Sequence, residues 1–136
     1  MTDLRALVDA MPFARALGVT LDTATPQEVR GRLAYSGEHC TLGGALHGGA
    51  VMTLADSIGA VCAYLNLPEG ASTTTLDSHS RFFRAVREGT LHAFSTPVHT
   101  GRTTITVHTD LTDDQGRRVA HTTQTQAVIR GATDRP

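Results

Sequence analysis

The sequence predicts an α+β domain in which an antiparallel sheet wraps around one long central helix. A helical apolar pattern in the middle of the chain, at residues 48–65, is the first observation behind this prediction. Alternating segments stand on both sides of it, and 14 of the 21 threonines lie between residues 73 and 125. Runs of strands separated by one helix do not form the alternating units of a parallel sheet.

Length and composition allow one domain. The 136 residues are 40% hydrophobic and 18% charged, a balance that can bury a single core and argues against a disordered chain. We expect one domain over residues 1–136, with an N-terminal helix within residues 1–12 and a disordered tail at residues 131–136.

Charge and hydropathy exclude several classes of partner. Twelve basic and thirteen acidic residues give a formal charge of -1, without the positive field on which sequence-independent nucleic-acid binding rests. No segment approaches the ~20 apolar residues that cross a bilayer, and the N-terminus lacks the layout of a signal peptide. We therefore expect a soluble, cytoplasmic protein with neither nucleic acid nor membrane as partner, whose Cys40 and Cys62 are free thiols.

The N-terminal part predicts a short helix and a hairpin. Apolar residues at helical spacing over residues 3–11 follow Thr2 as a candidate N-cap, and Pro12 ends the pattern. Residues 29–35 alternate in polarity after a Thr25-Pro26 turn, which predicts a strand paired in a hairpin with residues 16–23. Residues 36–46 have three glycines and no period, as is typical of a loop.

The central helix and the second half follow. Residues 48–65 keep apolar side chains at helical spacing, and many small residues among them let other backbones approach closely. Strands are predicted near 72–83, 89–99, 102–112 and 117–130, with hairpin turns at Gly101 and Gly116. We expect these four strands to form an antiparallel meander.

Two glycines at the start of the central helix suggest a use for bare backbone. Gly48 and Gly49 each cost roughly 1 kcal/mol relative to Ala within a helix. The first turn of a helix has unpaired N–H groups and the positive end of the dipole, which suit an oxygen that gains negative charge. Close packing explains the two glycines equally well, and the sequence leaves both explanations open.

Asp56 interrupts the small and apolar face of the same helix. A helix wrapped by sheet has little free surface, which favours a cleft position where the carboxylate can act as a base or nucleophile. A solvated surface carboxylate is the alternative, and the sequence leaves it open. Gly48 and Asp56 are eight residues apart, about 12 Å along a helix at 1.5 Å per residue. If both act on one carbonyl, they come from two subunits of a two-fold dimer with antiparallel helices.

These residues resemble the hotdog-fold acyl-CoA thioesterases, in the branch that includes 4-hydroxybenzoyl-CoA and phenylacetic-acid-pathway thioesterases. The resemblance covers roughly residues 12–130 and rests on Pro12-Phe13 through Leu17-Gly18, Gly43 through Leu46-His47-Gly48-Gly49, Leu54-Ala55-Asp56, Leu76-Asp77 and Gly101-Arg102. It implies a hotdog fold, an active homodimer and a tetramer built as a dimer of dimers.

The resemblance also implies roles for single residues. Asp56 corresponds to the catalytic carboxylate, as nucleophile or general base, and Gly48 to the oxyanion-hole N–H. His47 would hold the loop or polarise the carbonyl, and Thr75 would assist the attacking water. Thr41 stands where the family usually has Asn or Gln, so a shorter hydroxyl replaces an amide there.

Substrate contacts are expected at the cleft mouth. Coenzyme A carries three phosphate groups, so Arg102 beside Gly101, and then Arg81 and Arg84, are candidates to bind them. Gly49 and Asp77 are the other candidate substrate-binding residues. The remaining histidines are scattered without paired spacing, which predicts neither a metal site nor a metal cofactor, and we expect no organic cofactor.

The first functional hypothesis is therefore an acyl-CoA thioesterase that acts on a medium-chain or aromatic acyl group. The second is a non-catalytic acyl-CoA-binding or sensing protein on the same fold, which would not need Asp56. A hydratase is a weaker alternative, because the central helix lacks a His and acidic pair placed to add water across a double bond.

Overall fold

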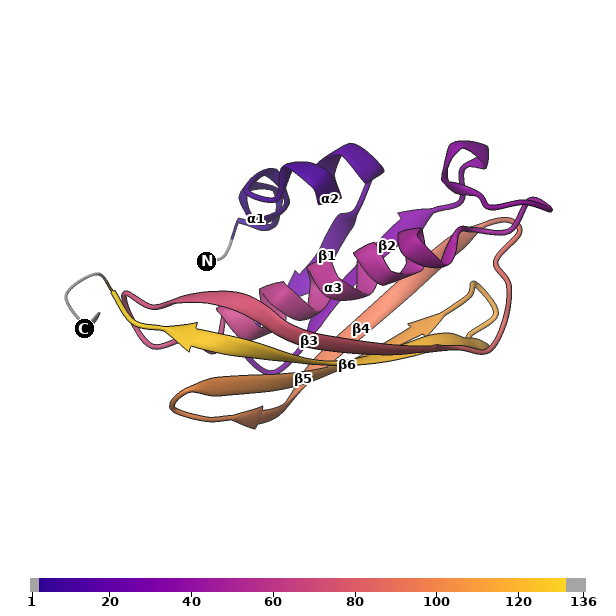
Figure 1. Ribbon diagram of the computed structural model, residues 1–136. Helices are drawn as coiled ribbons and strands as arrows, with labels where there is room; N and C mark the ends of the chain where they lie inside the picture. The colour runs from indigo at the N-terminus through magenta and orange to yellow at the C-terminus, as the bar shows by residue number, and fades with distance from the viewer. Residues whose placement is uncertain (1–2, 132–136) are drawn as a thin grey trace.

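The computed structural model describes residues 3–131, and one six-stranded antiparallel sheet packs against a long central helix (Figure 1). This arrangement confirms the predicted α+β fold with its antiparallel sheet and central helix. The predicted cap at Thr2 and the predicted tail from residue 132 onward lie outside the described residues.

Two short helices precede the first strand. Helix α1 (Leu4–Asp9) begins at Asp3, whose side chain accepts a hydrogen bond from the Ala6 amide at 3.1 Å. Pro12 does not end the helical region, because it opens helix α2 (Pro12–Leu17) at a position where a helix needs no N–H donor. Gly18 ends α2 with a left-handed φ of 100°. The prediction of a strand from residue 16 is therefore wrong at its start, and the strand begins at residue 20.

The predicted early hairpin is confirmed. Strand β1 (Thr20–Ala24) pairs antiparallel with β2 (Val29–Ala34), in which buried and exposed residues alternate. A 3-10 turn, η1 (Gly37–His39), and a single bridge between Cys40 and Leu46 order the loop that follows.

Helix α3 (Gly48–Tyr64) is the predicted central helix. Leu54, Ile58 and Cys62 are fully buried on it, one turn apart, so one stripe of α3 packs onto the sheet. The side chain of Ile58 packs directly against Gly31 of β2, where any Cβ would collide with it. The predicted close approach between the helix and the sheet is therefore also permitted by a glycine in the sheet.

The four later strands are β3 (Ser72–Phe82), β4 (Thr90–Thr100), β5 (Thr104–Thr112) and β6 (Arg118–Ile129). Their bounds confirm the prediction to within two residues, but the predicted meander of all four is wrong, because the sheet order is β1-β2-β4-β5-β6-β3. Strand β4 alternates buried and half-buried residues through Leu91, Ala93 and Ser95, which suits an interior position beside β2. Strand β3 is mostly exposed and lies at the edge, beside β6.

Among residues 3–131, no helix has both the length and the apolar character that a membrane crossing requires.

Candidate active site

The N-terminus of α3 is capped by His47. Its Nδ1 atom accepts a hydrogen bond of 2.8 Å from the Gly49 amide, so the proton of a neutral ring is on Nε2. A Cβ added at Gly49 would lie 2.9 Å from this Nδ1 atom, closer than carbon and nitrogen tolerate. Glycine at position 49 therefore makes room for the cap, and the Gly49 amide is already bonded.

The Gly48 amide, in contrast, has no hydrogen-bond partner within residues 3–131. The ring of Phe82 lies over Gly48, and a Cβ there would be 3.6 Å from Cζ of that ring, an ordinary contact. Close packing thus explains Gly49 and does not require Gly48. The first turn of α3 offers one bare N–H at the positive end of a helix of 17 residues.

Asp56 is exposed on α3, and one of its carboxylate oxygens is fixed by two neutral donors. Gln124 Nε2 donates to Oδ1 at 3.1 Å, and Thr75 Oγ1 donates to the same oxygen at 3.4 Å. Oδ2 accepts no hydrogen bond from the part of the chain that the structure describes. The carboxylate is therefore oriented by the sheet and keeps one oxygen available.

A second layer of polar side chains holds the first. Gln126 Nε2 donates to Thr75 Oγ1 at 2.8 Å, and Thr73 Oγ1 donates to Gln126 Oε1 at 3.2 Å. Gln124 and Gln126 are 0% and 1% exposed, which is unusual for amides and reflects this bonding. The sequence analysis missed both glutamines. The signal that could have found them is the two-residue alternation of β6. Gln124 and Gln126 share one face of this strand with Ala120 and Thr122, which are also buried.

Gly59 gives Gln124 its place. A Cβ at Gly59 would collide with the Oε1 atom of Gln124, so the amide lies directly on the helix backbone one turn after Asp56. The Oε1 atom is buried and accepts no hydrogen bond from the described residues. Burying an amide oxygen without a hydrogen bond lowers the stability of the fold. The hydrogen bond from Nε2 to Asp56 therefore indicates a functional reason for the amide at this position.

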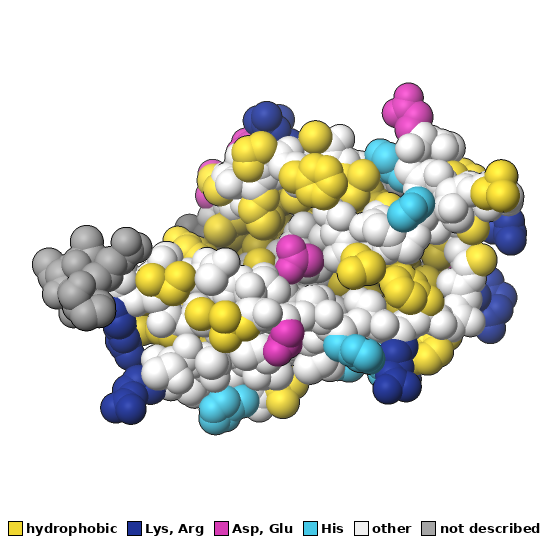
Figure 2. Space-filling view, in the orientation of Figure 1, with side chains coloured by type: hydrophobic (Ala, Val, Ile, Leu, Met, Phe, Trp, Pro, Cys, Tyr) yellow, Lys and Arg dark blue, Asp and Glu magenta, His cyan; other side chains and the backbone are white. Residues whose placement is uncertain are grey.

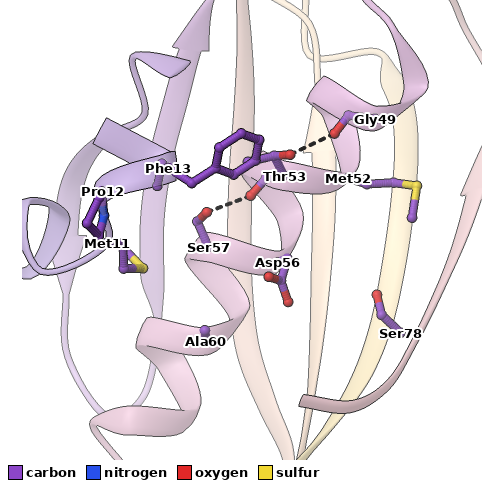
Figure 3. Close-up of a pocket in the computed structure, with 11 residues that line it drawn as sticks. Met11, Pro12, Phe13, Gly49, Met52, Thr53, Asp56, Ser57, Ala60 and Ser78 are labelled. Carbon is purple, nitrogen blue, oxygen red and sulfur yellow. Dashed lines mark hydrogen bonds between the residues drawn. The ribbon is translucent and has the colours of Figure 1, made fainter. Parts of the chain in front are cut away.

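Asp56 lines an open pocket of about 520 Å³ between α2, α3 and β3. Figure 3 shows Phe13 of α2 on one side, Ser78 of β3 on the other, and Asp56 between them. The walls are mostly apolar and comprise Met11, Pro12, Phe13, Ala14, Gly49, Met52, Thr53, Asp56, Ser57, Ala60 and Ser78. In the space-filling view, hydrophobic side chains surround an acidic group near the middle of this face (Figure 2).

The pocket continues along α3 toward the C-terminal end of the helix. A second hollow of about 260 Å³ shares Met11 and Ala60 with the first. It is lined by Leu7, Ala10, Met11, Ala60, Val61, Tyr64 and Thr73. Together the two hollows form an apolar groove along α3, and Asp56 lies within it.

A bulge in β3 decides which of its residues face this groove. The register shifts between Thr75 and Asp77, so Leu76 is an extra residue and the alternation changes phase there. Thr75 bonds Asp56 and Ser78 lines the pocket, so both face α3. Asp77 therefore faces the side of the sheet away from α3, outside the pocket that Asp56 lines.

The predicted arginines do not form one patch within a subunit. Arg81 of β3 pairs with His121 of β6, and Arg84 follows shortly after β3. Arg102 lies in the β4–β5 turn, next to Thr104, which pairs with Ala127 at the other end of β6. Since His121 and Ala127 are six residues apart, the two groups are separated by roughly 20 Å along the strand.

Thr41 and the cysteines lie outside the pocket. Thr41 is exposed in the loop before α3, where its amide donates to the Ala45 carbonyl at 2.9 Å. Cys40 and Cys62 are free, as predicted. Burial raises the pKa of the Cys62 thiol, although the Ser95 side chain partly opposes this, so Cys62 is a poor nucleophile.

Comparison with known proteins finds a family to which this chain is similar. The family model of the thioesterase superfamily matches residues 43–120, which include the helix cap, Gly48, Asp56 and Thr75.

Single relatives agree with this match. A Vibrio cholerae protein provisionally named an esterase is 38% identical over 87 residues, which are 64% of this chain and 58% of that protein. The chain thus matches less than two thirds of the length of this relative.

Solved structures share the fold. A thioesterase from Haemophilus influenzae has a TM-score of 0.91 at 23% identity, with 100% of this chain and 96% of that chain covered. A Streptococcus pneumoniae structure, titled a hypothetical thioesterase with coenzyme A, has a TM-score of 0.80 at 25% identity over 91% of this chain and 99% of that chain. These likenesses confirm the hotdog fold that the sequence analysis expected.

Proposed function

This chain belongs to the thioesterase superfamily, and from that premise we propose that it hydrolyses a medium-chain or aromatic acyl-CoA to the free acid and CoA. The observation that carries the proposal is the Asp56 carboxylate within an apolar groove. Its Oδ1 is fixed by Gln124 and Thr75, while Oδ2 is available to a reacting group. A thioester carbonyl bound beside Asp56, with its acyl chain in the groove along α3, would place the scissile bond near Oδ2.

The Gly48 amide is the proposed oxyanion donor. The tetrahedral intermediate of acyl transfer carries negative charge on the former carbonyl oxygen, and a fixed N–H at a helix N-terminus stabilises it. Gly48 and Asp56 are eight residues apart on one straight helix, about 12 Å, so they cannot serve the same carbonyl within one chain. The complete site therefore needs two subunits.

Strand β3 supports a dimer of the required geometry. It is an edge strand of 11 residues with Leu76 59% exposed, and such an edge readily pairs with a second copy. Asp56 contacts Thr75, and Gly48 contacts Phe82. A two-fold axis that crosses this edge at residue 79 lies midway between Thr75 and Phe82, because the extra residue Leu76 does not count in the pairing. It would set Asp56 of each subunit opposite the Gly48 amide of the other.

The same axis would complete the phosphate contacts. The β4–β5 turn with Arg102 lies at the Thr74 end of β3, because Ala127 pairs with both Thr74 and Thr104. Two-fold pairing would bring this end beside the Arg81 and Arg84 end of the partner. Three guanidinium groups from two subunits would then be available to the phosphates of CoA. A tetramer would be a pair of such dimers.

Two chemical routes are open to Asp56. As a general base, it takes a proton from water while the water oxygen attacks the thioester carbon. As a nucleophile, its own oxygen attacks, forming an acyl-aspartyl anhydride that water then hydrolyses. In both routes the C–S bond breaks, CoA leaves as a thiolate that is then protonated, and the acid is released. Thr75 would orient the water, and neither route needs a metal or an organic cofactor.

His47, Gly49 and Thr41 have supporting roles in this proposal. The His47 cap fixes the first turn of α3 and thereby the direction of the Gly48 N–H. Gly49 permits that cap and lines the pocket. Thr41, exposed in the preceding loop, would approach the substrate only from the loop side.

The test compares the wild-type protein with Asp56→Asn on a panel of short, medium, long and aromatic acyl-CoAs, with free thiol release as the readout. We expect hydrolysis to fall by orders of magnitude in Asp56→Asn, because the group acts on the reacting atoms. Asp9→Asn, which alters an exposed carboxylate at the end of α1, is the matched control. Full activity of a folded Asp56→Asn protein contradicts the proposal. Tight binding of intact acyl-CoA without turnover by the wild type would instead favour a sensing protein.

A further inference from the structure

A cluster of metal-ligating side chains lies on the face of the sheet that points away from α3. His108 and Asp110 of β5 alternate with buried Val107, Thr109 and Leu111, so they occupy the outer face. His121 of β6 is the direct cross-strand partner of Asp110. One ligand atom from each of His108, Asp110 and His121 lies within 4.8 Å of the others.

The spacing of these atoms suits a small cation. His108 Nε2 and Asp110 Oδ1 are 3.2 Å apart. Two ligands of a tetrahedral zinc ion, each about 2.0–2.1 Å from the metal, are about 3.3 Å apart. All three side chains are half-buried on rigid strands, so little order would be lost when an ion binds.

Neighbouring groups orient the two imidazoles. The Nδ1 atom of His108 lies 3.2 Å from Thr123 Oγ1. Histidines that bind metal through one ring nitrogen usually donate a hydrogen bond from the other, and Thr123 offers that acceptor. The His121 ring packs edge-on between Phe83 at 5.2 Å and His108 at 5.4 Å, measured between ring centroids. These contacts fix ring planes that a solvated histidine would not keep.

We propose that His108, Asp110 and His121 bind a divalent transition-metal ion of the zinc class, with a fourth position open to water. Two imidazoles and one carboxylate are a ligand set that zinc commonly takes. The site lies on the opposite face of the sheet from α3, which carries Asp56. It is therefore separate from the proposed thioester chemistry, and it would be an exception to the sequence prediction of no metal site.

Arg118 is a neighbouring cation that opposes metal binding. Its removal should therefore change the zinc affinity in a predictable direction. The guanidinium of Arg118 lies 3.6 Å from Asp110 Oδ1, the oxygen that the metal would take. Its side chain is 60% exposed, so it can move into solvent when an ion binds. We expect Arg118→Ala to bind zinc more tightly than the wild type, because the competing charge is gone.

The experiment titrates the chelator-treated full-length protein with Zn²⁺ by calorimetry and with Co²⁺ by visible absorption. We expect one ion per chain and affinity weaker by at least about tenfold in Asp110→Asn and in His121→Ala. Asp110→Asn keeps the size of the side chain and an oxygen for His108, and its unfolding temperature without metal checks the fold. Added zinc should raise the unfolding temperature of the wild type more than those of Asp110→Asn and His121→Ala.

His92→Ala is the matched control. His92 and Asp114 form a comparable pair, 2.8 Å apart on the surface, but within residues 3–131 they have no third ligand of this kind. Equal zinc affinity in the wild type, Asp110→Asn and His121→Ala overturns the proposal, as does an equal loss in His92→Ala. Since the readouts are binding and unfolding, the result is independent of whether the protein hydrolyses acyl-CoA.

Discussion

Gln124 of β6 donates a hydrogen bond of 3.1 Å to Oδ1 of Asp56 on α3, across 68 residues of sequence. The direction of this carboxylate is thus set by the sheet and not by the helix that carries it. Gly59 allows the contact, because any side chain at that position would displace the amide.

Gln124→Met should lower kcat by about tenfold to a hundredfold with little change in KM, because the carboxylate loses its main donor and shifts. Methionine is unbranched and of similar length, so it fits beside Gly59 without a hydrogen bond. Steady-state kinetics check this, with Gln115→Met, an exposed turn residue, as the control. An unchanged kcat would mean that Gln124 has no positioning role.

Gly48→Pro should lower kcat by about a hundredfold or more, because it removes the one N–H proposed to hold the oxyanion. Proline is tolerated at the first position of a helix, and His47 has the extended ψ of 136° that a following proline requires. Gly48→Ala keeps the N–H and adds a Cβ 3.6 Å from the Phe82 ring, so it should remain active. If both variants keep wild-type kcat, another donor holds the oxyanion.

Mixing the two inactive variants tests the shared site. Hybrid dimers of Asp56→Asn and Gly48→Pro, refolded together in equal amounts, contain one site with both groups intact. Since half of the dimers are hybrids with one working site each, activity should recover to about a quarter of wild type. The double variant, which carries both substitutions in one chain and is refolded alone, gives the baseline activity. No recovery from verified hybrids would show that each site belongs to a single chain.

Gly49→Ala should be less stable than Gly48→Ala by about 1 kcal/mol, the usual cost of losing a helix cap. Both changes bring the same gain in helix propensity, but the Cβ at position 49 would lie 2.9 Å from His47 Nδ1 and push the ring away. Urea unfolding of the two variants measures the difference. Equal stabilities would indicate that the His47 cap contributes nothing.

Local pattern was sufficient for most of the elements, and it singled out two of the residues proposed for the site. The period of residues 48–65 predicted α3, and alternation predicted the later strands to within two residues. Gly48 and Asp56 could be singled out because each breaks the expectation for its place in a helix. Pro12 misled the prediction, since the same residue that ends one helix can open another.

Contacts between distant segments could not be predicted in the same way. The edge position of β3, the inward-facing Gln124 and Gln126, and the cluster of His108, Asp110 and His121 all depend on which strands pair. The bulge at Leu76, which turns Asp77 to the side of the sheet away from α3, is a further feature of the pairing between β3 and β6.

The sequence by itself therefore determined most of the secondary structure, the family resemblance and the candidate carboxylate, because periodicity and motifs act over a few neighbouring residues. Only the tertiary structure decided what holds that carboxylate and which histidines meet. The strand order is stabilised by the burial of α3 against the whole sheet. The free energy of this burial comes from residues that are far apart in the chain.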